Sequence, residues 1–379
     1  MFKSKTSYLL LLFFLLQFSF IYGQMPLAKT AKISILTCEK GDELYSLFGH
    51  TAIRIKDEAN TLDVVYNYGT FDFKTERFYL KFIKGDLKYF VSAYSFNEFY
   101  YEYTLENRAI YEQKLDLTML QKQQLFDALN KSLLSDDKFY TYKFIDRNCT
   151  NMVVDKVNQS LGKKCIVKTT EHNESYREIL FPYLENHFYE NLGINIIFGK
   201  KVDENGVKLF LPNQFMESLR VAKYNGKLIA EEPKTILKAS TEEKGKSLWN
   251  NFYTFCLALF LIFISRKVWI YLSFFIMLGF LGLFLSTIGL YSLHEEVTYN
   301  YNILLFNPLL LILIIFYWQK NYIWVKRMAL ICLFCLVIML IVLLNKPNLL
   351  MFLPMITCSG VLLYYFMRRS NQELLTTIK

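Results

Sequence analysis

A cysteine in a polar turn is the first residue whose setting suits chemistry. Cys149 lies in the segment DRNCTN (146–151), and the residues that follow, 152–161, have helical character. A cysteine at a helix start meets the positive end of the helix dipole and free backbone N–H groups, and both favour the thiolate. Arg147 adds a positive charge nearby. The pattern indicates a nucleophile. A buried structural cysteine, or one half of a disulfide, is the alternative.

A histidine is the base that such a thiol most often uses near neutral pH. Of the four histidines, His50 follows a glycine and precedes the strand-like segment TAIRI (51–55). A Cys–His pair also needs a third group that orients the imidazole. The next strand-like segment, LDVVYNY (62–68), offers Asn67 and Asp63, and side-chain alternation does not choose between them. A structural histidine at a strand start is the alternative for His50.

The elements that position these residues are predicted to be both strands and helices. Strands are expected at 32–36, 51–55 and 62–68, and a further extended segment at 139–144. A helix is expected over 114–134, where four leucines recur at helical spacing. We therefore expect an α+β domain over residues 24–234, followed by a polar, charged linker over 235–248.

The remaining residues, 249–379, are predicted to form an all-α transmembrane bundle of about five helices. The sequence there is mostly apolar with short polar breaks. Each apolar stretch is near the length that spans a hydrocarbon core at 1.5 Å per residue. The stretches lie at about 249–265, 268–291, 301–318, 325–345 and 348–367.

The charges around these stretches predict which side of the membrane each loop occupies. Residues 1–23 are expected to be a secretory signal, with an uncleaved anchor as the alternative, so the domain that follows is exported. The first helix then runs inward, and the cytoplasmic side receives most of the cations, as the positive-inside rule requires. These cations are Arg266, Lys267, Lys320, Lys326, Arg327, Arg368 and Arg369.

Composition excludes several classes of function. The net charge of +9 is spread out, and no dense basic run suits nucleic acid. Of the seven cysteines, Cys332 and Cys335 have CxxC spacing, but they lie in an apolar stretch without a second pair, so no metal site and no cofactor is predicted. Three cysteines, Cys38, Cys149 and Cys165, remain for the exported domain, and at least one of them has no partner there.

Three segments of the exported domain together resemble a known family. They are LTCEKGDELYSLFGHTAIRI (36–55), YNYGTFDF (66–73) and DRNCTN (146–151), and they are similar to the Lnb proteins of Bacteroidota. The loop segment HEEVTYNYNILLFNPL (294–309) also fits, so the resemblance covers nearly the whole chain. The order of a His strand, a polar strand and a later Cys helix is similar to the circularly permuted NlpC/P60 (papain-like) fold of the lecithin:retinol acyltransferases.

The resemblance implies a lipoprotein N-acyltransferase of the inner membrane with its catalytic domain in the periplasm. Phospholipid would be the acyl donor, and a diacylated lipoprotein would be the acceptor. The implied catalytic residues are Cys149 as nucleophile, His50 as base and Asn67 as the group that orients it. Supporting roles fall to Asp146, Arg147 and Asn148 beside the cysteine, with Asn148 as an oxyanion donor, and to His294, Glu295 and Asn302 at the lipid access.

Two other functions remain open from the residues alone. One is a cysteine peptidase or amidase that acts on the cell wall, as many unpermuted relatives of this fold do. The other is a non-catalytic periplasmic sensor or scaffold.

Overall fold

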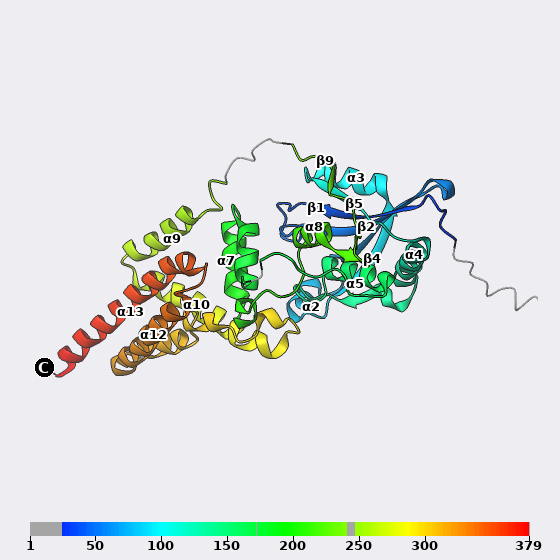
Figure 1. The fold of residues 1–379 in the computed structure, drawn as a ribbon. Coiled ribbons are helices and arrows are strands. Elements are labelled where there is room, and N and C mark those ends of the chain that lie inside the picture. The colour runs from blue at the N-terminus through cyan, green and yellow to red at the C-terminus, as the bar shows by residue number, and fades with distance from the viewer. Residues whose placement is uncertain (1–24, 172, 241–246, 379) are drawn as a thin grey trace, which may run out of the picture.

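The protein consists of a sheet-containing α+β domain followed by a helical bundle (Figure 1). The computed structural model describes residues 25–171, 173–240 and 247–378, so the expected signal at 1–23 lies outside the described residues. The domain occupies one end of the molecule, and the bundle extends from it to the C-terminus. This arrangement is the predicted fold class.

A seven-stranded antiparallel sheet forms the centre of the α+β domain, with the order β6-β4-β3-β2-β1-β5-β9. All three predicted strands belong to it, and their register places Cys38 opposite His50 and Ala52 opposite Asn67. The strands are β1 (Lys32–Cys38), β2 (His50–Asp57), β3 (Leu62–Thr70), β4 (Lys88–Ser95), β5 (Ile110–Lys114), β6 (Phe139–Thr141) and β9 (Lys234–Leu237).

Two boundaries differ from the sequence prediction. The helix expected from residue 114 is α4 (Met119–Leu134), because Thr118 forms a capping box with Gln121 and residues 110–114 pair with β1 instead. The segment expected to be a linker from residue 235 begins within β9, which pairs with β5 and forms one edge of the sheet. Both errors arise from long-range strand pairing that no local pattern reports.

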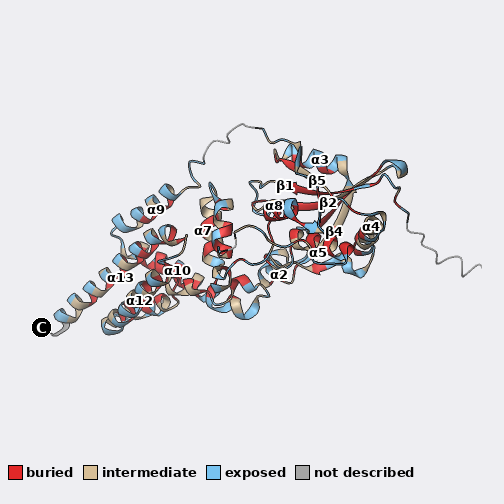
Figure 2. Ribbon diagram, viewed as in Figure 1, coloured by how far each residue is buried: buried red, intermediate tan, exposed pale blue. Residues whose placement is uncertain are grey.

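Helices cover both faces of the sheet, so the central strand β1 is buried at six consecutive positions. On one face, α4 and α5 (Cys149–Leu161) pack against Ile33, Ile35 and Ile53 of the central strands. On the other face, α3 (Phe96–Leu105) buries Phe99 against Leu36. Figure 2 shows the buried residues gathered between these layers. The smaller elements are α2 (Phe78–Lys84), α6 (Tyr176–Leu180), α7 (Phe188–Ile197), α8 (Pro212–Val221) and the hairpin of β7 (Lys223–Tyr224) and β8 (Lys227–Leu228).

The C-terminal bundle contains four segments that are long and apolar enough to cross a membrane, and one shorter apolar helix. The shorter helix, α9 (Phe252–Ile264), has 13 residues and so a length of about 20 Å, less than the roughly 30 Å of a hydrocarbon core. The second of the four long segments, Glu295–Trp318, begins with two 3-10 turns. The other helices are α10 (Val268–Tyr291), α11 (Leu309–Trp318), α12 (Tyr322–Leu343) and α13 (Leu349–Ile378).

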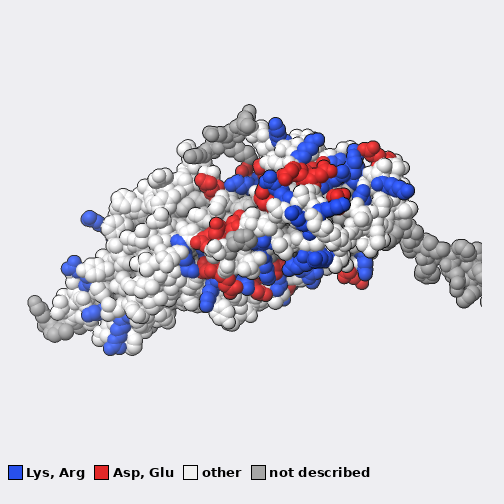
Figure 3. Space-filling view, viewed as in Figure 1, with Lys and Arg blue, Asp and Glu red and all other residues white. Residues whose placement is uncertain are grey.

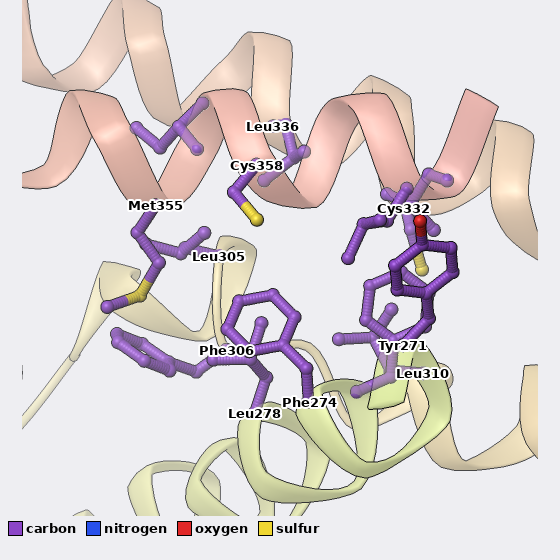
Figure 4. Close-up of a cluster of buried hydrophobic side chains, with 14 of the residues drawn as sticks. Tyr271, Phe274, Leu278, Leu305, Phe306, Leu310, Cys332, Leu336, Met355 and Cys358 are labelled. Carbon is purple, nitrogen blue, oxygen red and sulfur yellow. The ribbon is translucent and has the colours of Figure 1, made fainter. Parts of the chain in front are cut away.

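The bundle has its own apolar core and an outer surface with few charges. Figure 4 shows Cys332 and Cys358 among side chains such as Phe274 and Leu336, so both cysteines are packing residues. Charged groups gather over the α+β domain, whereas most of the visible bundle surface is uncharged (Figure 3). Such a surface suits lipid tails as the surrounding solvent.

Polar contacts fix the domain on the bundle. The side chain of Asn302 is fully buried and donates to the backbone carbonyls of Asn195 and Ile196 at the end of α7. The buried guanidinium of Arg177 bonds Asp203, whose carboxylate also pairs with Lys346 of the loop between α12 and α13. These contacts join groups far apart in the chain, so they fix the α+β domain relative to the bundle.

Candidate active site

The first turn of α5 carries Cys149, and the side chain before it builds that turn. Asn148 Oδ1 accepts hydrogen bonds from the backbone N–H groups of Thr150 and Asn151 at 2.9 and 3.1 Å. Its Nδ2 donates to the carbonyls of Phe144 and Phe210 at 2.8 and 2.7 Å. Both amide hydrogens are thus in use, so Asn148 is the helix cap and not the free oxyanion donor that we expected.

The imidazole of His50 lies between Cys149 and Asn67. Its Nε2 is 3.0 Å from Asn67 Oδ1, and the Cys149 thiol lies close enough to the ring for each group to shift the pKa of the other. Asn67 Nδ2 donates to the carbonyl of Val65 at 3.3 Å, which turns Oδ1 toward the ring. An Nε2–H donated to Asn67 leaves Nδ1 to receive the thiol proton. Gly49, with a φ of +79°, allows the close approach of this turn to the Cys38 carbonyl.

The electrostatics of the pair favour charge separation. Burial acts to raise the pKa of Cys149, but the charge and hydrogen bond of His50 and the Thr51 backbone N–H bring the net pKa below its usual value. Burial likewise acts to lower the pKa of His50, and the Cys149 sulfur and Asn67 bring the net pKa above its usual value. Each group thus stabilises the charged form of the other, and the thiolate is the nucleophilic form of the cysteine.

Asp63, the competing third residue, lies at the other end of β3. Its carboxylate holds the Arg54 guanidinium in a bidentate pair, with both distances 2.7 Å. Arg54 also bonds Glu112 and lies over the ring of Phe96. The side chain of Asp63 is thus committed to this cluster, which leaves Asn67 as the residue beside His50.

The remaining polar neighbours of the cysteine lie outside the cluster. Arg147 is exposed and lies over the Tyr140 ring, 5.1 Å from its centroid. Asp146 pairs with Lys208. Neither side chain contacts the Cys149 sulfur, so the charge we expected from Arg147 does not act on the thiol by contact.

The loop between α10 and α11, which we expected at the lipid access, reaches the active-site turn through a glutamate. Glu296 is 3% exposed, and its Oε1 accepts a hydrogen bond from the backbone N–H of Ile145 at 3.1 Å, four residues before the cysteine. Glu295 pairs with Lys143 of the same turn at 3.3 Å. His294 instead bonds the Phe82 carbonyl, and Asn302 caps α7. The loop therefore supports the site, and neither His294 nor Asn302 lies beside the sulfur.

A buried arginine near the site was not identified from the sequence. Arg108 bonds Glu106 and the carbonyl of Glu39. Its positive charge acts to lower the pKa of His50, against the larger effects that raise the net pKa. It holds the start of the loop that leads to His50. In the described parts of the chain all seven cysteines are free thiols, including Cys38 and Cys165, and no group of three or more metal-ligand side chains occurs.

Removal of the helix cap should destabilise the domain. We expect Asn148→Ala to lower the free energy of unfolding by about 2 kcal/mol, because the cap is lost and one buried and one partly buried carbonyl lose their donor. Thermal unfolding of the full-length protein in detergent measures this loss. The matched variant Ser95→Ala removes the exposed cap of α3 and should cost about half as much. Equal losses in both variants would contradict the structural role assigned to Asn148.

These features define a class of protein: an α+β domain with a Cys–His–Asn cluster, carried by a transmembrane helical bundle. Residues 19–179 match the family model of the Lnb N-terminal periplasmic domain. The N-terminal domain is therefore similar to the periplasmic domain of Lnb proteins, and the chain is a membrane protein with a periplasmic domain of this type. Searches of curated proteins and of solved structures gave no match.

Proposed function

We propose that this protein is a thiol-dependent lipoprotein N-acyltransferase of the inner membrane. It would move an acyl chain from phospholipid to the α-amine of an N-terminal diacylglyceryl-cysteine. The observation that carries the proposal is the Cys149–His50–Asn67 cluster, whose cysteine turn is hydrogen-bonded to a loop that follows a membrane-length helix. A thiol nucleophile held at the outer surface of a bilayer suits substrates that are themselves lipids.

The first half-reaction forms an acyl-enzyme. The Cys149 thiolate attacks the carbonyl carbon of a phospholipid ester. The tetrahedral oxyanion then accepts a hydrogen bond from the backbone N–H of Cys149, which opens α5 and has no intrahelical acceptor. Collapse breaks the ester C–O bond, and the His50 imidazolium gives its proton to the departing lysophospholipid oxygen. A thioester on Cys149 and a neutral His50 remain.

The second half-reaction transfers the acyl group to nitrogen. The α-amine of the diacylglyceryl-cysteine attacks the thioester carbonyl, and His50 accepts the proton that the amine loses. Collapse expels the Cys149 thiolate and leaves an amide. The imidazolium and thiolate are restored, so no cofactor or metal is needed to balance the reaction.

The location of the domain follows from the cost of moving lipid. Exposing one buried CH₂ costs about 0.8 kcal/mol, so drawing a long acyl chain fully into water would cost on the order of 10 kcal/mol. A catalytic domain fixed to membrane helices keeps both substrates in the bilayer. Asn302, Arg177 and Glu296 belong to the contacts that hold the domain in this position.

Lipoproteins and wall fragments from cells with and without this protein test the function. We expect mass spectrometry to find triacylated lipoprotein N-termini only when the protein is present, and unchanged muropeptides in both cases. Altered cross-link peptides with unaltered lipoproteins would instead identify a cell-wall peptidase or amidase. No change in either would contradict catalysis and favour a sensor or scaffold.

The hydrogen bond from Ile145 to Glu296 gives a further prediction. Glu296→Ala should lower kcat for acyl transfer about tenfold, because the turn before Cys149 loses its buried acceptor and a small displacement is costly in catalysis. Glu296→Gln keeps an oxygen acceptor and should retain most of the activity. Glu295→Ala breaks only an exposed ion pair and should have little effect. Equal activity of Glu296→Ala and the wild type would contradict this role.

A further inference from the structure

The helix α2 exposes its apolar side chains instead of burying them. None of its residues is buried, and Tyr79, Leu80 and Phe82 are 74%, 63% and 45% exposed. Phe73, just before the helix, is 61% exposed. An apolar cluster of this kind in a short segment marks an interaction site and not a water-facing surface. We call residues 73–84 the α2 segment.

The α2 segment is attached to the end of a membrane-length helix. Ser292 and Leu293 donate to the carbonyls of Ile83 and Lys84 at 2.9 and 2.7 Å, immediately after α10 ends at Tyr291. The His294 ring bonds the Phe82 carbonyl at 2.9 Å. Figure 1 shows α2 beside this loop, on the side of the domain that meets the bundle. Because α10 is long enough to span, its C-terminal loop places the α2 segment at the membrane surface.

The charges of α2 suit a lipid surface. The α2 segment carries the basic residues Lys74, Arg77, Lys81 and Lys84 and one acidic residue, Glu76, which pairs with Arg77 at 3.5 Å. Basic residues on a helix with exposed aromatic and aliphatic groups are typical of segments that lie in the interface between headgroups and acyl chains. At the end of α10, Leu290 and Tyr291 are 90% and 57% exposed, so the apolar surface continues from α2 onto the spanning helix.

A row of aromatic rings leads from the α2 segment toward the cysteine. Phe78 contacts Phe71, Phe71 contacts Tyr89, and Tyr89 stacks on Tyr142, with centroid distances of 5.9, 5.4 and 4.4 Å. The last ring of the row is that of Tyr142, and Gly69 lies between it and Cys149. Its φ is +90°, and a β-carbon there would lie 3.6 Å from Tyr142 and 3.7 Å from the Cys149 β-carbon.

An open groove borders the same rings. It has a volume of about 740 Å³, and its lining combines apolar rings such as Phe71 and Phe90 with three lysines and two aspartates: Lys81, Lys88, Lys138, Asp72 and Asp86. A mixture of apolar surface and cations suits the phosphate region of a glycerophospholipid.

We propose that the α2 segment inserts into the outer leaflet of the bilayer and admits the donor acyl chain to the aromatic row that ends at Cys149. The partner is the lipid surface itself. The insertion is argued from the exposed side chains and the contacts with the α10 loop, and it does not depend on the proposed function. The admission of the acyl chain rests on the proposed function.

Fluorescence quenching tests the insertion. The full-length protein in vesicles would carry a bimane dye at Leu80→Cys, with signal from the labelled parent protein subtracted. We expect strong quenching by lipids brominated near the top of the acyl chains. The matched control is Leu134→Cys on α4, a site that is 82% exposed and has no contact with the bundle loop. Equal, weak quenching at both sites would overturn the proposal, whatever the activity.

Activity on two kinds of donor tests the acyl route. Leu80→Glu should lower transfer from vesicle phospholipid about tenfold and leave reaction with a water-soluble short-chain ester unchanged, and Leu134→Glu should alter neither. An equal loss with both donors, or no loss with phospholipid, would overturn the route. Quenching at residue 80 in a protein that transfers no acyl group from any donor would refute the proposed function but retain the insertion.

Discussion

Replacing Cys149 by alanine will lower the rate of acyl transfer from phospholipid to a diacylated lipopeptide by roughly 10⁴-fold or more. The reason is that covalent catalysis splits the transfer into two steps that share this sulfur, and no neighbouring side chain can replace it. The purified full-length protein in phospholipid vesicles, with lipopeptide product quantified by mass spectrometry, gives the measurement. Cys149→Ser should lose nearly as much, because its hydroxyl is far less acidic than the thiol.

A second cysteine supplies the control for this substitution. Cys165 is also a free thiol of the periplasmic domain, and its side chain packs at the edge of the core without contact to His50. Cys165→Ala should keep activity within about twofold of the wild type, because volume lost at a core edge affects stability more than catalysis. Comparable activity of Cys149→Ala and Cys165→Ala would refute nucleophilic catalysis by Cys149.

Replacing His50 by alanine will raise the pH at which Cys149 becomes a thiolate. In the wild type the pKa of Cys149 lies below its usual value, because the charge and hydrogen bond of His50 outweigh the effect of burial. Without the imidazole, burial remains and acts in the opposite direction. The midpoint of iodoacetamide labelling should therefore move upward by at least about one pH unit, which lowers labelling at pH 7 about tenfold.

The pH profile of a second histidine variant provides the comparison. His294 bonds a backbone carbonyl of α2 and has no contact with the sulfur, so His294→Ala should leave the labelling midpoint unchanged. Acyl transfer by His50→Ala should also fall by about 10³-fold, because the same ring moves the proton in both half-reactions. A midpoint shared by His50→Ala and the wild type would show that His50 does not activate the thiol.

The sequence was sufficient for the strands that carry two of the three central residues, but not for the choice between Asn67 and Asp63. Side-chain alternation puts both residues on one face. The register decides, because β2 and β3 are joined by a tight connection at 58–61 that pairs Asp57 with Leu62 and therefore Ala52 with Asn67. Counting back from that turn would have placed Asn67 near His50 and Asp63 about 13 Å further along the strand.

Contacts between distant segments could not be predicted from local patterns. Glu296 and Ile145 lie 151 residues apart in the sequence. The cluster of Arg177, Asp203 and Lys346 also joins segments that are distant in the sequence. Asn148 was identified as important, but its cap role depends on the Phe210 carbonyl from a distant loop. Such residues join a site only when the bundle and the domain are both in place, so neither periodicity nor motif spacing reveals them.

The most direct test of the central claim is the intact mass of the full-length protein after incubation with phospholipid and no acceptor. The account predicts one added acyl group on Cys149, which hydroxylamine releases because it is a thioester. Addition of a diacylglyceryl lipopeptide should remove this acyl group from the protein. The same acyl group should then be recovered on the lipopeptide amine. Two results would contradict catalysis through a Cys149 thioester. One is a preparation that converts lipopeptide but forms no adduct, and the other is an adduct on a different residue that passes its acyl group to the amine.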